Sequence, residues 1–219
     1  MESLPQQLLL HIIEYAGYAC LLYNPEIITV ENYEKYLKYS LFHDSVEYLK
    51  LVLALKLELK DIIVEAVRCN ALQCVIFLTK NGYPNDGYSI WVAAFNGYLK
   101  CLIYLTEAGC PKDRDATWAA AIEGHLDCLI YLTEAGFFKH EEATWAAANN
   151  GHLECLKLIT KHGFHKHEEA TLSAAENGHL ESLKYLTEAG YHKHEDAISI
   201  AKRNGHTDCV VFMQEHGYK

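Results

Sequence analysis

The stretch Ala147-Ala-Asn-Asn-Gly-His-Leu-Glu154 recurs along the chain with only conservative changes. Residues 120–127 and residues 174–181 keep the order Ala-Ala-x-x-Gly-His-Leu-acid, one period of 27 residues before and after it. A fixed period of this length is typical of repeat proteins, in which each unit buries its apolar face against its neighbours. The repeat therefore decides the fold.

Two sets of glycines keep the same period and mark two turns in every unit. The first set is Gly97, Gly124, Gly151, Gly178 and Gly205, and the second is Gly82, Gly109, Gly136, Gly163, Gly190 and Gly217. Glycine enters the left-handed conformation without Cβ strain, so it commonly closes the last turn of a helix. Each unit is therefore predicted to contain two short helices.

The two helices differ in composition. After Gly-His, a segment such as residues 126–132 places its apolar residues on one broad helical stripe, while Asp127 and Glu134 interrupt any strand-like alternation. The other helix is rich in alanine, which lets neighbouring helices approach closely. We expect it at residues 116–122, 143–149 and 170–176.

The Ala-Ala-x-x-Gly-His-Leu-Glu order resembles the core of ankyrin repeats, and five units match well over residues 84–217. Ankyrin repeats usually run about 33 residues and carry a Thr-Pro-Leu-His tetrapeptide. This chain has a shorter period and reads Ala-Thr-Trp-Ala at residues 116–119 and 143–146. Because the missing residues are most economically the β-hairpin, the resemblance implies an all-α ankyrin-like solenoid of about six to seven helix pairs with little or no hairpin. Such short repeats are similar to those of large DNA viruses and some protists.

The repeat weakens toward both ends. Residues 70–74 fit the Gly-His-Leu-x-Cys positions with Asn70 in place of glycine, and residues 45–50 fit after a shift of one residue. Lys202 and Arg203 give the last unit a polar surface, as expected of a terminal repeat. We predict a capping region at residues 1–40 and the repeat array at residues 41–219.

Residues 4–15 read Leu-Pro-Gln-Gln-Leu-Leu-Leu-His-Ile-Ile-Glu-Tyr and resemble the opening helix of an F-box. An F-box docks on the linker protein of cullin-type ubiquitin ligases, so the resemblance implies a substrate-recruiting adaptor. Its adaptor-binding residues would be Leu4, Pro5, Leu8, Leu9 and Ile12. A helix that caps the first repeat explains the same apolar face, and both interpretations stay open.

Composition narrows the function classes. Half of the residues are hydrophobic and the formal net charge is -10, which disfavours binding to a phosphate backbone. No uninterrupted apolar run is long enough to span a bilayer, and the first 30 residues lack the pattern of a signal peptide. We expect a cytoplasmic protein, or one of the host cytoplasm or nucleus if the chain is viral, which binds neither nucleic acid nor membrane.

The cysteines follow the repeat rather than a disulfide pattern. Cys74, Cys101, Cys128 and Cys155 are spaced by one period, and Cys209 falls on the same grid. This spacing predicts a small buried apolar position in each unit.

Two columns of residues are candidates for binding a protein partner. In ankyrin-like stacks the position two before the Gly-His pair faces the concave groove, which implies a column of Phe95, Ile122, Asn149, Glu176 and Arg203. A second column contains Trp91, Trp118 and Trp145, followed by Leu172 and Ser199. The tryptophans either anchor a partner or fill the space between repeats. We predict a monomeric protein–protein interaction module or scaffold.

The histidine-rich linkers raise a metal hypothesis. Lys-His-Glu recurs at residues 139–141, 166–168 and 193–195, and histidine and glutamate are zinc ligands by type. Because the pattern recurs with the array, one structural cause explains all three copies, although a metal- or pH-responsive sensor is a further alternative. No phosphate loop, dinucleotide fingerprint or HExxH motif is present. We expect no metal, no cofactor and no catalytic residue.

Overall fold

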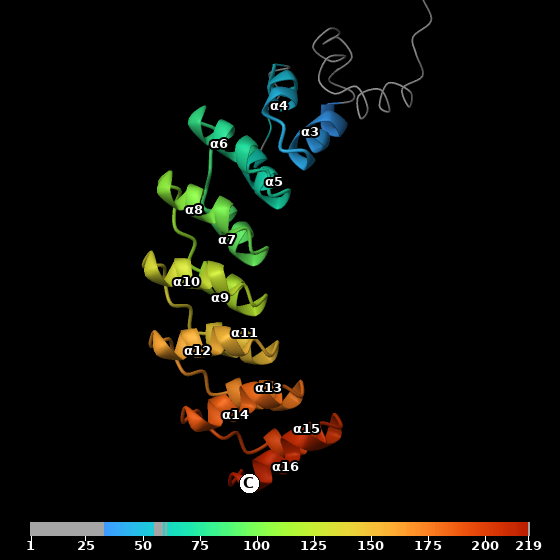
Figure 1. The fold of residues 1–219 in the computed structure, drawn as a ribbon, viewed down its shortest axis with the longest axis vertical. Helices are drawn as coiled ribbons and strands as arrows, with labels where there is room; N and C mark the ends of the chain where they lie inside the picture. Colours follow the sequence, from blue (N-terminus) through green and yellow to red (C-terminus); the bar gives the residue numbers. More distant parts are fainter. Residues whose placement is uncertain (1–32, 55–58, 60, 219) are drawn as a thin grey trace, which may run out of the picture. The chain divides into compact units, whose positions relative to one another are not determined.

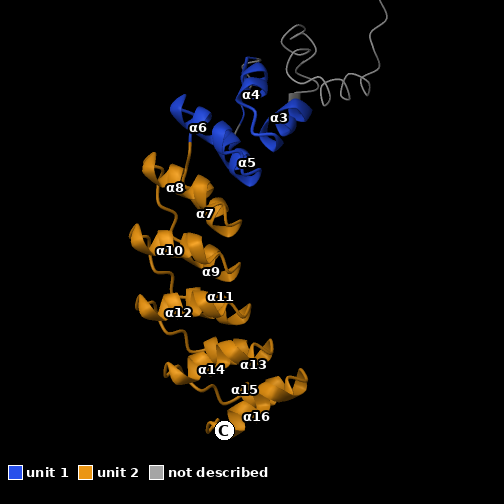
Figure 2. Ribbon diagram, viewed as in Figure 1, with its two compact units in different colours: residues 1–84 blue, residues 85–219 orange. Residues whose placement is uncertain are grey.

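The structure, a computed structural model, describes residues 33–54, 59 and 61–218. The chain forms two compact units, Met1–Pro84 and Asn85–Lys219 (Figure 2). The F-box-like segment at residues 4–15 lies outside the described residues. The boundary expected after residue 40 stays a prediction.

The second unit is a stack of helix pairs (Figure 1). The first, or inner, helices of the pairs are α7 (Tyr88–Phe95), α9 (Ala116–Ile122), α11 (Ala143–Asn149), α13 (Ala170–Glu176) and α15 (Ala197–Arg203). The second, or outer, helices are α8 (Leu99–Glu107), α10 (Leu126–Glu134), α12 (Leu153–Lys161), α14 (Leu180–Glu188) and α16 (Thr207–Glu215). The described residues contain no strand, so the predicted all-α, hairpin-poor solenoid is confirmed.

The first unit repeats the same pairing with a weaker sequence signal. It contains α3 (Tyr33–Phe42), α4 (Val46–Leu53), α5 (Ile62–Arg68) and α6 (Leu72–Lys80). Asp44 and Asn70 take φ values of 49° and 55°, the left-handed conformation that glycine takes at the corresponding turns elsewhere. The Asp44 carboxylate also accepts 2.9 Å hydrogen bonds from the backbone amides of Gln73 and Cys74, which begin α6. With these two pairs, the described chain contains seven helix pairs, at the upper end of the predicted number.

Alanine explains why the inner helices pack side by side. In α9 and α11 the three consecutive alanines, residues 119–121 and 146–148, are fully buried. Small side chains let the backbones of successive inner helices come close, while larger residues such as Leu129 and Leu132 fill the space beneath the outer helices. The core therefore runs continuously along the second unit.

The cysteine column lies in this core. The described cysteines are free thiols, and those of the column are buried. Burial, with a smaller contribution from the adjacent Asp127, raises the pKa of Cys128 to about 12, and burial beside Glu154 raises the pKa of Cys155 to about 11. These thiols stay protonated at neutral pH and act as small apolar side chains, as predicted.

The two glycine sets have different surroundings. Gly151 and Gly163 both have positive φ, 71° and 66°. A Cβ on Gly163 would meet nothing within 4 Å, whereas a Cβ on Gly151 would lie 2.5 Å from Nδ1 of His179 in the next unit. The same contact joins Gly97 to His125, Gly124 to His152 and Gly178 to His206. We call these four contacts the Gly–His ladder.

Two histidines of the ladder, His152 and His179, also bond to the preceding inner helix. Nε2 of His152 lies 3.1 Å from the carbonyl oxygen of Ile122, and Nε2 of His179 lies 3.0 Å from that of Asn149. Since a carbonyl only accepts, Nε2 donates in both bonds. Each bond satisfies a carbonyl at a helix end that has no partner within its own helix.

Candidate functional site

The inner-helix face is the surface formed by three positions of each inner helix. On α7 these positions hold Tyr88, Trp91 and Phe95, whose i, i+3 and i+7 spacing places them in one stripe. The rings of Tyr88 and Trp91 stack with centroids 5.4 Å apart and an interplanar angle of 14°, and those of Trp91 and Phe95 stack at 4.8 Å and 15°. Tyr88 is 40% exposed, and the other two rings are half-buried. We call this stack the aromatic ladder.

In the next unit the corresponding positions hold Asp115, which is the N-cap residue of α9, and Trp118 and Ile122 within the helix. Trp118 and Ile122 are half-buried. The side chain of His140, in the following linker, contacts both Asp115 and Trp118. Its ring centroid lies 6.4 Å from that of Trp118, and its Nε2 lies 3.4 Å from Oδ1 of Asp115. The indole nitrogen of Trp118 is buried and has no hydrogen-bond partner. Trp118 thus packs against the following linker and still reaches the surface, so both interpretations of the tryptophan column stay open.

The column that begins with Phe95 becomes polar from α11 onward. Trp145 on α11 is half-buried, and Asn149 beside it is tied to its surroundings: its amide donates to Asn150, and Asn177 donates to its Oδ1 at 3.1 Å. Glu176 and Arg203 are exposed. The predicted column therefore changes from apolar at Phe95 to charged at Arg203 along the stack, and its binding role stays a prediction.

A neighbouring asparagine column has a structural role that the sequence did not reveal. The side-chain amide of Asn150 donates to the carbonyl of Ile122 at 2.6 Å, and that of Asn204 donates to the carbonyl of Glu176 at 2.9 Å. These bonds join consecutive units at the ends of their inner helices. The 27-residue spacing of the asparagines was a visible signal, but their partners, 28 residues away, were not.

The linker lysines are held on the side of the outer helices. Lys112, Lys166 and Lys193 each donate about 2.6 Å hydrogen bonds to carbonyls at the end of the next outer helix, at Ala135, Ala189 and His216. Each ammonium group also lies over an aromatic ring, at 4.8 Å from Phe137, 5.0 Å from Tyr191 and 5.6 Å from Tyr218. A positive charge at a helix C-terminus is favourable, so these lysines stabilise the array.

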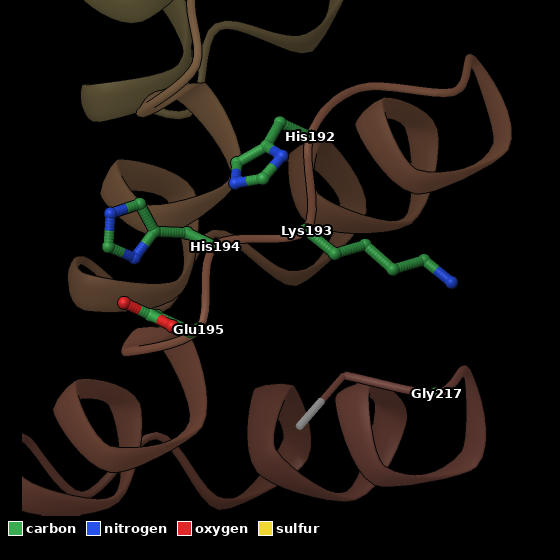
Figure 3. A pocket seen from close by; sticks show the side chains of 5 residues that line it. All are labelled: His192, Lys193, His194, Glu195 and Gly217. Atoms are coloured by element: carbon green, nitrogen blue, oxygen red, sulfur yellow. The ribbon is translucent and has the colours of Figure 1, made fainter.

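The linker histidines have a local structural role. Nδ1 of His140, His167 and His194 accepts a 3.2 Å hydrogen bond from the backbone amide two residues later, just before an inner helix begins. Figure 3 shows the last linker, where the His192 and His194 side chains extend to one side and Lys193 to the other. Within the described part of the chain, no group of three or more His, Cys, Asp or Glu side chains is arranged to hold a metal ion.

Carboxylates line the linker edge of the inner-helix face. Asp115, Glu142, Glu169 and Asp196 occupy the position of Tyr88 in successive units, and all four are exposed. We call these four residues the acidic row. Apart from the Asp115–His140 contact, the described residues place no cationic side chain within ion-pair distance of them.

An open depression at the first end of the acidic row adds further negative charge. It has a volume of about 570 Å³, and its lining contains four carboxylates (Asp86, Asp113, Asp115 and Glu141) and two basic side chains (Lys112 and Arg114), together with Phe138 and His140. Burial and the neighbouring charges of Asp115 and Asp86 raise the pKa of Asp113, against a lowering backbone hydrogen bond. A site of this composition favours a cation over an anion.

Comparisons with known proteins agree with this architecture. Residues 90–170, and again residues 118–197, match the family model of ankyrin repeats in three copies. The crystal structure of the human ASB11 ankyrin repeat domain is similar, with a TM-score of 0.63 and 19% sequence identity over 72% of this chain and 84% of that one. At this identity the likeness establishes the fold. No curated protein matches the chain. None of the helices described is both long and apolar enough to cross a membrane.

Proposed function

The chain belongs to the ankyrin-repeat family through residues 90–197, and on this premise we propose that its inner-helix face captures one protein partner. Ankyrin repeats are protein–protein interaction modules and act as scaffolds rather than enzymes. In this proposal the chain acts as a monomer and needs no cofactor or catalytic residue. The aromatic ladder supports the proposal most directly. Its rings are stacked in a fixed arrangement on a rigid helix, so a partner would meet a surface that loses little side-chain entropy on binding.

The polar end of the face would set partner choice. Phe95 and Ile122 supply apolar area, whereas Glu176 and Arg203 present charges of opposite sign two and three units further along. A partner must place matching groups over both regions, because an unmatched charge at an interface is left without its water and without a partner. We expect binding in the cytoplasm, or in the host cytoplasm or nucleus if the chain is viral.

The double substitution Phe95→Asp with Ile122→Asp tests this proposal. Two carboxylates on the apolar part of the face should reduce capture of the partner at least about tenfold, since each hot-spot residue contributes about 1–2 kcal/mol or more. Affinity capture from source-cell lysate with quantitative mass spectrometry measures the loss, and far-UV circular dichroism checks that the helices are retained.

A matched control carries the same charge change on the outer helices, Ile130→Asp with Val211→Asp, where Ile130 is half-buried and Val211 is 53% exposed. The control should capture the partner as the unchanged chain does. Equal capture by both double variants would remove the inner-helix face from the account. The milder pair Phe95→Ala and Ile122→Ala should give a smaller loss in the same direction.

A further inference from the structure

The charges around the aromatic ladder indicate the chemistry of the partner, an inference that rests on the proposed function. Next to the acidic row, the linkers contribute Glu141, Glu168 and Glu195, which are exposed and, like the row, recur once per unit. Carboxylates therefore follow the linker edge of the inner-helix face from α9 to α15. Adjacent carboxylates repel each other, and cations supplied by a binding partner would reduce this repulsion.

The cations nearest in sequence do not neutralise this edge. Lys112, Lys139, Lys166 and Lys193 alternate with these carboxylates along the chain, but each ammonium group donates to a carbonyl at the end of an outer helix. The four ammonium groups therefore lie on the outer-helix side of the linkers, away from the acidic row. The sequence alone, with Lys-His-Glu in each linker, gives no sign of this separation of charge.

The other basic side chains of the linkers and inner helices in the described part of the second unit lie at the two ends of the face. The guanidinium of Arg114 lies 5.0 Å from the centre of the Phe138 ring, and Lys202 and Arg203 belong to the last inner helix. Between them, the units that begin with α11 and α13 present Glu141, Glu142, Glu168 and Glu169 without a described ion pair. The face therefore joins an aromatic surface to an uncompensated acidic edge.

We infer that the docking segment of the partner is cationic and arginine-containing, with one arginine or apolar side chain packed on the aromatic ladder and further cationic side chains paired with the acidic row. Guanidinium groups suit both places, because they stack on aromatic faces and bind carboxylates through two parallel hydrogen bonds. The segment is extended or loosely helical and lies across the inner helices. At about 10 Å between packed helices, four carboxylates span about 30 Å, which an extended segment of about 10 residues covers.

The test uses a phage-displayed library of random peptides about 12 residues long, selected on the full chain and then measured by fluorescence anisotropy. Enriched peptides should carry net positive charge with at least one arginine residue, and their affinity should fall as salt rises. The probe variant is Asp115→Asn, Glu142→Gln, Glu169→Gln and Asp196→Asn together. It keeps side-chain shape and removes four charges, none of which caps a helix through its side chain.

The matched control removes four exposed carboxylates from the outer helices, through Asp127→Asn, Glu134→Gln, Glu188→Gln and Asp208→Asn. The probe variant should bind the enriched peptides about tenfold more weakly, because it loses four exposed ion pairs, while the control should lose less than about twofold. Equal losses in both variants would show general attraction to an acidic protein and would overturn the inference.

Enrichment of acidic or uncharged peptides, or of none, would also overturn it. The proposed function fails separately: if Phe95→Asp with Ile122→Asp still captures the partner from lysate, the inner-helix face itself is wrong. If that variant loses capture while the four-amide probe variant retains it, the face binds a partner whose docking segment is not cationic.

Discussion

Replacing Gly151 with alanine should destabilise the chain by about 3 kcal/mol, whereas the same change at Gly163 should cost only about 1 kcal/mol. Both residues have nearly equal positive φ, so an added Cβ strains both backbones alike. At Gly163 the Cβ enters open space, but at Gly151 it would lie 2.5 Å from Nδ1 of His179. The imidazole cannot retreat without losing its hydrogen bond to the carbonyl of Asn149. Urea unfolding of the two variants measures the difference.

The same substitution made in a His179→Ala variant isolates the contribution of the contact between Gly151 and the imidazole ring. In a chain with His179→Ala, the substitution Gly151→Ala should cost only the backbone strain, about 1 kcal/mol, because the ring is gone. The Gly151–His179 contact of the ladder then has a coupling free energy of about 2 kcal/mol. If Gly151→Ala and Gly163→Ala are equally destabilising in the unchanged chain, the ladder makes no contribution and both glycines serve only as turns.

Removing one whole period should be tolerated, while removing half a period should abolish cooperative folding. Deletion of residues 143–169 joins Glu142 to Ala170 and keeps every inter-unit contact in phase: Gly124 would face His179, and Lys139 would meet Ala189. In a solenoid the stability is close to a sum over units and their neighbours, so we expect a loss of about 1–4 kcal/mol, from about 0.05–0.15 kcal/mol per residue. The ellipticity per residue should not change.

Deletion of residues 143–156 instead places the second half of α12 directly after a linker. The Gly–His ladder and the lysine bonds then fall out of register, and an outer-helix stripe takes the place of the alanine-rich α11. We expect loss of the cooperative transition in circular dichroism and urea unfolding. Equal tolerance of both deletions would contradict the repeat-by-repeat account of stability.

The helix bounds were predictable because their causes are local. Glycines and alanine runs fix where an inner helix begins and ends, and the expected spans 116–122, 143–149 and 170–176 agree with α9, α11 and α13. The weak first unit was harder, since Asp44 and Asn70 replace glycine at left-handed positions. Aspartate and asparagine are the residues that tolerate this conformation best after glycine, which is the signal that the unit retains.

The contacts between units were not predictable from one sequence. The histidine of the Gly-His pair does begin an outer helix, as His152 does at the N-cap of α12, but its side chain also bonds to a carbonyl 30 residues earlier and its ring covers Gly124. Likewise, the linker motif Lys-His-Glu suggested metal ligands, whereas its lysine reaches an outer helix and its histidine accepts a backbone hydrogen bond. A period shows that a residue matters to each unit without showing which neighbour it contacts.

Tryptophan fluorescence tests the central claim, that the inner-helix face holds the partner, most directly. The chain has three tryptophans, Trp91, Trp118 and Trp145, and all lie in one column of this face. The full chain is titrated with a tryptophan-free segment of the captured partner, whose binding is followed independently by anisotropy. We predict that the emission shifts to shorter wavelength and acrylamide quenching falls, both with the Kd that anisotropy gives. Saturated binding with unchanged emission and quenching would place the partner elsewhere and contradict the account.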